Sequence, residues 1–255
     1  MKCIFGVSTD IGIKKKINQD SITVRTGTCN GKNVTMAILC DGMGGLQLGE
    51  VASATIINRF IEWSDVNLSD IVERLDMIEE VEHQWQELLE DLNEKLYIYG
   101  QENGTNLGST ITGVLVVENQ YVVVNVGDSR TYILDDEIYQ ITDDQSLMAR
   151  EIKMGRLTVE QAAVDPRRNV LLQCVGATKN IEIEFYNGVM CNGQALLLCS
   201  DGFRHMVNDE EIFNYMNPIN MNDEQIIEET LDELVRMNME RQETDNITAA
   251  YIKFV

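Results

Sequence analysis

The sequence predicts an α+β fold, because hairpin-forming strand pairs and amphipathic helices occupy separate stretches of the chain. Apolar and β-branched runs are joined by short polar turns in two places, 109–117 with 121–126 and 131–134 with 138–141. Apolar positions three and four residues apart predict helices at 48–63 and, in one or two pieces, at 69–100. No repeat, low-complexity tract or proline-rich linker divides the 255 residues, so we expect one domain, 1–255.

The other elements follow from the same patterns, taken in chain order. Strands are predicted at 3–9, 21–26, 34–40, 181–187, 195–199 and 247–254. Helices are predicted at 145–154, 158–163, 209–216 and 223–239. The irregular region around 144–180 is long for a connection inside a compact domain, and we expect it to form a functional flap.

Charge and cysteine usage restrict the possible partners and the cellular compartment. The formal net charge of −22 argues against nucleic acid and anionic membranes as partners, because both repel such a surface. The six cysteines show no CxxC spacing, which favours reduced thiols in a cytoplasmic protein over a disulfide framework. No segment approaches 18 uninterrupted apolar residues and the start of the chain lacks a long apolar region, so we expect neither membrane insertion nor secretion.

The stretch from Val34 to Gly45 combines a buried strand with a single carboxylate. Six of the seven residues in 34–40 are apolar, which indicates a strand that is covered on both faces. Asp41 follows, and the glycines after it (Gly42, Gly44, Gly45) leave backbone carbonyls accessible. A carboxylate beside bare carbonyls suits a hard cation, whereas an Asp in a strand-to-helix turn can also cap the next helix. This stretch alone leaves both interpretations open.

Carboxylates recur at the ends of other predicted strands. Asp20 precedes one strand and Asp245 another, while Asp128 and Asp201 each follow an apolar run. If the fold brings them together, their repulsion requires cations between them. An all-oxygen set in a chain with only two histidines favours Mg²⁺ or Mn²⁺ over zinc.

Five short motifs occur in a fixed order along the chain. They are Asn18-Gln19-Asp20, Asp41-Gly42-Met43-Gly44-Gly45, Gly127-Asp128-Ser129-Arg130, Ser200-Asp201-Gly202 and Asp245-Asn246. In this order they resemble the metal-dependent serine/threonine protein phosphatases of type 2C (the PPM family), and most closely its bacterial branch, in which Met follows Asp-Gly. The resemblance implies a four-layer α/β/β/α sandwich of two antiparallel sheets flanked by helices, with a two-metal centre at one end.

The resemblance also implies a role for each acidic position. Asp41 would bridge two Mn²⁺ or Mg²⁺ ions, and the Gly42 carbonyl would ligate one of them. Asp201 and Asp245 would hold the other ion, while Asp20 would orient metal-bound water. These four aspartates are the predicted catalytic residues.

Three further positions follow from the same resemblance. Asp128, together with Asp201, matches the site of a third, weaker metal, and Asn246 would help to fix phosphate. The basic phosphate-binding position, usually Arg in the family, falls at Lys15, although Lys14 or Lys16 could replace it. Lysine supplies a charge without the bidentate fork of arginine.

Other departures from the family pattern lie in the flap region. Gln145 and Asp165 stand where the family has histidines, which changes the contacts that the flap can make. By contrast, we expect Arg130 to be a structural ion-pair partner and His205 to belong to the start of a helix.

The implied function is hydrolysis of phosphoserine and phosphothreonine in proteins by a metal-activated water, without a phosphoenzyme. Its partners would be phosphorylated proteins and a cognate serine/threonine kinase, and the enzyme would act as a monomer. Two alternatives remain open. One is a non-catalytic type-2C-like domain that binds and regulates a phosphoprotein, which the changes at Lys15 and in the flap motivate. The other is a hydrolase of small phosphoesters on the same scaffold.

Overall fold

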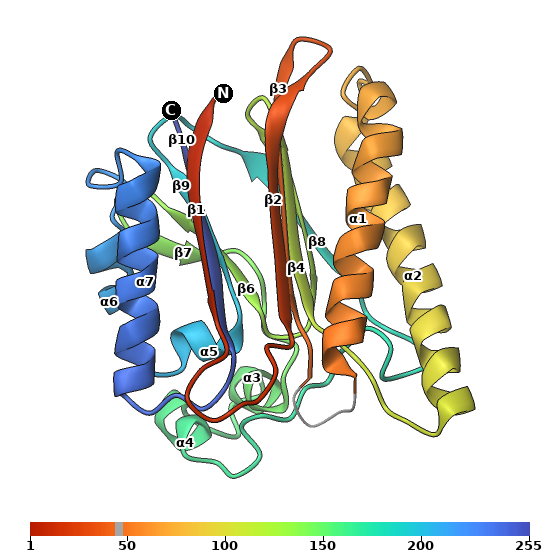
Figure 1. Cartoon of the computed structure of the whole chain (residues 1–255), viewed down its shortest axis with the longest axis vertical. Coiled ribbons are helices and arrows are strands. Elements are labelled where there is room, and N and C mark those ends of the chain that lie inside the picture. The colour runs from red at the N-terminus through yellow and green to blue at the C-terminus, as the bar shows by residue number, and fades with distance from the viewer. Residues whose placement is uncertain (44–47) are drawn as a thin grey trace.

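In the described part of the chain, two antiparallel sheets of five strands each form the centre of the molecule (Figure 1). The computed structural model describes residues 1–43 and 48–255, so Gly44 and Gly45 of the glycine-rich motif lie outside the described residues. The first sheet has the spatial order β1 (Cys3–Asp10), β10 (Ile247–Phe254), β9 (Ala195–Cys199), β6 (Arg130–Leu134) and β7 (Ile138–Gln140). The second has the order β2 (Asp20–Cys29), β3 (Lys32–Asp41), β4 (Ile111–Val117), β5 (Gln120–Val126) and β8 (Glu184–Val189).

Helices cover the outer face of each sheet (Figure 1). The second sheet is covered by α1 (Gly49–Ile71) and α2 (Met77–Asn103), and the first by α6 (Asp209–Met216) and α7 (Glu224–Glu240). The short α5 (Asp201–Arg204) follows β9, while α3 (Leu147–Lys153) and α4 (Val159–Ala163) lie at one end of the sandwich. The predicted four-layer α/β/β/α architecture is therefore confirmed. In the described part of the chain, no helix is both long and apolar enough to cross a lipid bilayer.

The alternation of side chains along β3 shows why this strand is apolar on both faces. Met36, Ile38 and Cys40 pack in the core beneath α1 and α2. Ala37 and Leu39 point the other way and pack in the core between the two sheets. Because successive side chains of a strand face opposite sides, a strand with a sheet on one face and helices on the other needs apolar residues at nearly every position.

Several predicted boundaries were wrong: the helix predicted from residue 69 begins only at Met77, and the strand predicted at 21–26 continues to Cys29. The predicted helix 48–63 continues to Ile71, because Ile71 extends the apolar stripe that packs under α2, and a turn at 72–76 then separates α1 from α2. The predicted strand 181–187 begins only at Glu184, where pairing with β5 starts. Ile181 and Ile183 alternate as in a strand, but they pack against the helix-side core without a strand partner.

A cluster of three aromatic side chains packs between α1 and α2. The Trp85 ring is fully buried and lies edge-on to Phe60 and Trp63, with centroid separations of 5.3 and 5.4 Å. Trp85→Ala should lower the free energy of unfolding by about 3–5 kcal/mol, because it leaves a large cavity. Urea denaturation followed by circular dichroism measures this loss.

The matched control is Trp85→Phe. The indole nitrogen of Trp85 has no hydrogen-bond partner among the residues that the structure describes, so phenylalanine keeps most of the packing and removes an unsatisfied donor. We expect this variant to lose less than about 1.5 kcal/mol. Equal losses for the two variants would show that ring packing does not stabilise the α1–α2 layer.

Candidate metal centre

Five aspartates gather at one end of the sandwich because of the antiparallel topology. In the second sheet Asp20 begins β2 and Asp41 ends β3, so the two residues lie directly opposite each other in the strand register. In the first sheet Asp201 follows the end of β9, and Asp245 precedes the start of β10. Asp128 lies in the connection from β5 to β6, which joins the two sheets. In neighbouring antiparallel strands, the end of one strand lies beside the start of the next. In both sheets these strand termini lie at the same end of the sandwich (Figure 1).

The carboxylates are close enough to oppose one another's ionisation. Burial raises the pKa of Asp20 to about 7, and the nearby charges of Asp201 and Asp245 contribute to the rise, whereas the hydroxyls of Thr248 and Ser200 reduce it. Burial also raises the pKa of Asp41 well above its ordinary value, with repulsion from the other four aspartates. Like charges directly across a strand pair destabilise a sheet, so this arrangement favours either protonation of a carboxyl group or a compensating positive charge.

Asp128 belongs to a buried network of charges. Burial and repulsion from Asp201 raise its pKa to about 7, although the Arg204 guanidinium opposes this shift. Arg204 donates to the Asp128 carbonyl over 2.8 Å and lies 3.5 Å from an oxygen of Asp144. Arg130 binds the same Asp144 through two hydrogen bonds of 2.7 and 2.8 Å, which confirms its predicted role as a structural ion-pair partner.

Glycines after two of the aspartates allow backbone segments to approach closely. A Cβ atom on Gly42 would lie 2.5 Å from the carbonyl oxygen of Gly49, and one on Gly202 only 2.1 Å from that of Asn246. Both separations are too short for any side chain. The Asp-Gly pairs are thus explained by the close contact of the loops that carry the carboxylates.

The loop between β1 and β2 is hydrogen-bonded to the segment that carries Asp245. The amide of Asn246 donates to the carbonyls of Ile11 and Ile17 and accepts from the Gln19 amide nitrogen, over 2.9–3.2 Å. Asn246 is only 2% exposed, and these three contacts occupy its side chain. We therefore propose that it positions the loop, in place of the predicted phosphate contact. Lys15, on the same loop, forms an ion pair of 2.6 Å with Asp245.

One buried acid at the centre was not anticipated. Glu243 is 4% exposed; one of its oxygens accepts from the amide nitrogens of Thr244 and Asp245, and the other lies 3.2 Å from His205 Nδ1. The second nitrogen of His205 lies 3.5 Å from Asp201, so this histidine links two acids of the centre. The expectation that His205 belongs to the start of a helix was wrong, because the short α5 begins at Asp201 and His205 directly follows its end. The polar run Arg-Gln-Glu-Thr around Glu243 is typical of a surface turn, and nothing in its pattern indicates burial.

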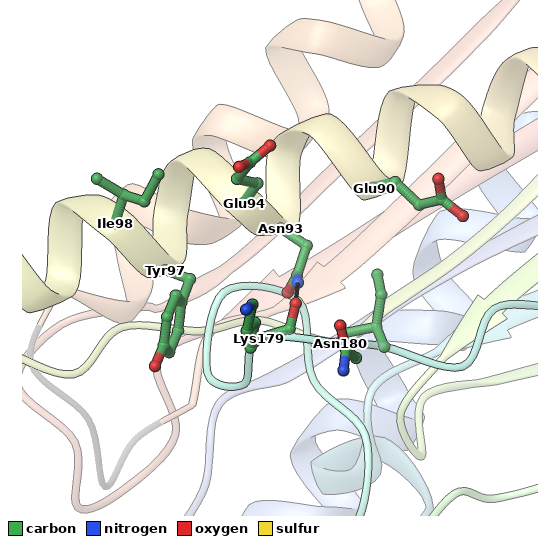
Figure 2. A pocket seen from close by; sticks show the side chains of 8 residues that line it. Glu90, Asn93, Glu94, Tyr97, Ile98, Lys179 and Asn180 are labelled. Carbon is green, nitrogen blue, oxygen red and sulfur yellow. Dashed lines mark hydrogen bonds between the residues drawn. The ribbon is translucent and has the colours of Figure 1, made fainter.

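The segment 144–180 is attached to the rest of the molecule at several points. Ser109 exchanges backbone hydrogen bonds with Val175, and its hydroxyl donates to the carbonyl of Asp41. Gln145, a departure from the family pattern, binds the backbone of Gly127. At the other end Asn93 of α2 donates to the carbonyls of residues 178 and 179, as Figure 2 shows for Lys179. The segment thus contacts the backbone of Asp41 through Ser109.

The residues of this centre suit a hard divalent cation. Both carboxylate oxygens of Asp20 and one of Asp201 are buried without a well-formed hydrogen bond to any described residue, although the hydroxyls of Thr248 and Ser200 lie near Asp20. Buried polar atoms normally have partners. The donors are all oxygens, which Mg²⁺ and Mn²⁺ prefer. No three Asp, Glu, His or Cys side chains converge on one point in the described ranges. Such convergence is not required, since Mg²⁺ is usually held by one or two carboxylates together with water.

Comparisons with known proteins agree with this picture. The model of the protein phosphatase 2C family matches residues 13–236. The protein phosphatase PhpP of Streptococcus pneumoniae is 31% identical over 246 residues, which cover 96% of this chain and 94% of PhpP. The chain belongs to the protein phosphatase 2C family.

Solved structures extend the comparison to the fold. The S. agalactiae serine/threonine phosphatase superimposes with a TM-score of 0.85 at 27% identity, over 100% of both chains. The catalytic domain of the serine/threonine protein phosphatase PstP, solved with two manganese ions, gives a TM-score of 0.77 at 25% identity and covers 98% of this chain and 97% of that one.

Removing one of the buried charges should stabilise the metal-free protein. The carboxyl of Asp20 has a folded-state pKa of about 7 against an ordinary value of 3.8. As pH rises from about 4 to about 7, the unfolded chain releases this proton first, so the folded state loses stability over that range. Asp20→Asn mimics the protonated form. In chelator at about pH 8, we expect it to raise the free energy of unfolding by at least about 1.4 kcal/mol, the equivalent of one pKa unit.

The gain should be smaller at about pH 5.5, where the native Asp20 is still largely protonated. Urea denaturation at the two pH values tests this. Asp136→Asn, at an exposed position in the β6–β7 turn, removes the same charge and should leave stability within about 0.5 kcal/mol. A loss of stability in Asp20→Asn at the higher pH would contradict the repulsion argument.

Proposed function

We propose that this chain hydrolyses phosphoserine and phosphothreonine in proteins, using divalent cations held by the aspartate centre. The observation that carries the proposal is the grouping of five aspartates at one end of the sandwich, where both oxygens of Asp20 and one of Asp201 are buried without a well-formed hydrogen bond to a described residue. Membership of the protein phosphatase 2C family and the similarity to PhpP support the same activity. When bound, two divalent cations would acidify a water and neutralise charge on the phosphoryl oxygens.

The chain's own residues have separate tasks in this proposal. Asp41 and the Gly42 carbonyl would hold cations at the end of β3, and Asp201 and Asp245 would complete the set from the first sheet. Asp20 lies opposite Asp41, and neither of its oxygens makes a well-formed hydrogen bond to a described residue, so it can orient the attacking water by accepting a hydrogen bond from it. We propose two Mn²⁺ or Mg²⁺ ions. The PstP structure with two manganese ions supports this number.

Substrate phosphate would be bound by Lys15 and the cations. Lys15 is within 2.6 Å of Asp245, and its ammonium group can donate to a phosphoryl oxygen from there. Lysine acts as a single point charge, so it orients the phosphate less strictly than a bidentate arginine. Asp128 lies beside Asp201 at a position suited to a third, weaker cation, although Arg204 already neutralises part of its charge.

Residues 144–180 are proposed to act as a flap within a single domain, 1–255. The hydrogen bonds of Ser109 support this role, because they connect Val175 of the segment with the backbone of Asp41. We propose that the enzyme works as a monomer in the cytoplasm and reverses the action of a serine/threonine kinase. The strongly acidic composition makes nucleic acid and anionic membranes unfavourable partners.

Activity on a phosphothreonine peptide should depend on metal and on Asp201. Purified protein with Mn²⁺ should release phosphate, and excess chelator should abolish the release. Asp201→Asn removes a cation ligand and should lower kcat/KM by about 100-fold or more, the scale on which active-site electrostatic groups act. Malachite-green detection of phosphate measures both effects, and Asp136→Asn serves as the charge-matched control with unchanged turnover.

Two results would replace the proposed function with one of the alternatives. No metal-dependent turnover by the wild type, or equal turnover by Asp201→Asn, would favour the non-catalytic phosphoprotein-binding domain. A preference of orders of magnitude for sugar or nucleotide phosphates over the phosphopeptide would favour the small-molecule hydrolase.

A further inference from the structure

The loop of residues 11–17, which we name the cationic loop, differs in charge from the rest of the chain. It contains three consecutive lysines (Lys14, Lys15, Lys16) and no acidic residue, whereas the whole chain has 42 acidic residues against 20 Lys and Arg. Ile13 and Ile17 on the same loop are 49% and 54% exposed. Exposed isoleucines next to cations at a substrate-binding edge are suited to contact with another chain.

The loop is held rigidly at both ends. Asn246 binds the carbonyls of Ile11 and Ile17, and a turn closes where the Gly12 amide donates to Asp10 over 2.7 Å. A Cβ atom on Gly12 would lie 2.2 Å from the Asp245 carbonyl oxygen, so this end of the loop is in close backbone contact with the segment that carries Asp245. The tip of the loop is therefore fixed beside the metal centre.

The three lysines point in different directions. Lys15 turns inward and pairs with Asp245. Lys14 and Lys16 are exposed, and neither forms an ion pair with any residue that the structure describes. The sequence left the phosphate-binding lysine open among the three, and this geometry assigns Lys15 to the centre. One lysine on each side of that position has no ion-pair partner among the described residues.

We propose that Lys14 and Lys16 bind acidic side chains that flank the phosphorylated residue of a protein substrate. The proposal rests on the function proposed above. An acidic segment is repelled by most of a chain with a net charge of −22, so a cationic loop at the edge of the centre offers it a local site of opposite charge. Ile13 and Ile17 would contact apolar side chains of the same segment.

Two phosphothreonine peptides test the proposal, identical except that one has aspartates and the other asparagines beside the phosphorylated residue. The measured quantity is the ratio of kcat/KM for the acidic peptide to that for the neutral peptide. Lys14→Gln/Lys16→Gln should lower this ratio by about fivefold relative to wild type, the scale of two exposed ion pairs. Raising the salt to about 0.5 M should lower the wild-type ratio in the same direction, because exposed pairs are screened.

The control Lys2→Gln/Lys95→Gln removes two exposed lysines outside the cationic loop, of which Lys95 pairs with Asp91 on α2, and should keep the wild-type ratio. An unchanged ratio in Lys14→Gln/Lys16→Gln would overturn the proposal, including the case in which both peptides lose rate equally because these lysines bind the phosphate itself. Hydrolysis of the neutral peptide by the wild type supports the phosphatase function separately. If neither peptide is hydrolysed, both proposals fail.

Discussion

The repulsion among five closely grouped aspartates is the constraint on which the functional end of this protein depends. Burial of Asp20 and Asp128, together with repulsion from neighbouring carboxylates, raises their pKa values to about 7, whereas Asp41, Asp201 and Asp245 remain partly exposed to solvent. Such an arrangement is unfavourable for folding unless cations neutralise it. The surrounding structure compensates by holding the carboxylates on two sheets whose cores are extensive and apolar.

The parts that hold the centre in place are mostly uncharged. Gly42 and Gly202 allow backbone segments to approach within distances that any side chain would prevent. Asn246 and Ser109 use their side chains on backbone groups, one tying the cationic loop to the Asp245 segment and the other binding the carbonyl of Asp41. Rigid positioning of this kind matters for catalysis, because charge stabilisation is effective only when the groups do not have to reorganise.

Charge is distributed unevenly, and this distribution links structure to substrate choice. The chain as a whole is strongly acidic, and the arginines near the centre are engaged: Arg130 and Arg204 both contact Asp144. The lysines of the cationic loop differ from these arginines, because only one of them is engaged. Lys15 pairs with a carboxylate of the centre, while Lys14 and Lys16 face solvent at its edge. A substrate that carries both phosphate and acidic side chains matches this pattern.

The sequence by itself determined the layered fold and the aspartates that meet at the centre. Strand and helix periods are local properties, and the ordered Asp-containing motifs carry a family resemblance that no single motif has. Only the tertiary structure decided which lysine faces the centre, that Asn246 holds a loop, and that Glu243 is buried against His205. These facts depend on contacts between residues up to about 230 positions apart. A side chain's direction and burial are set by such distant partners, so no local pattern contains them.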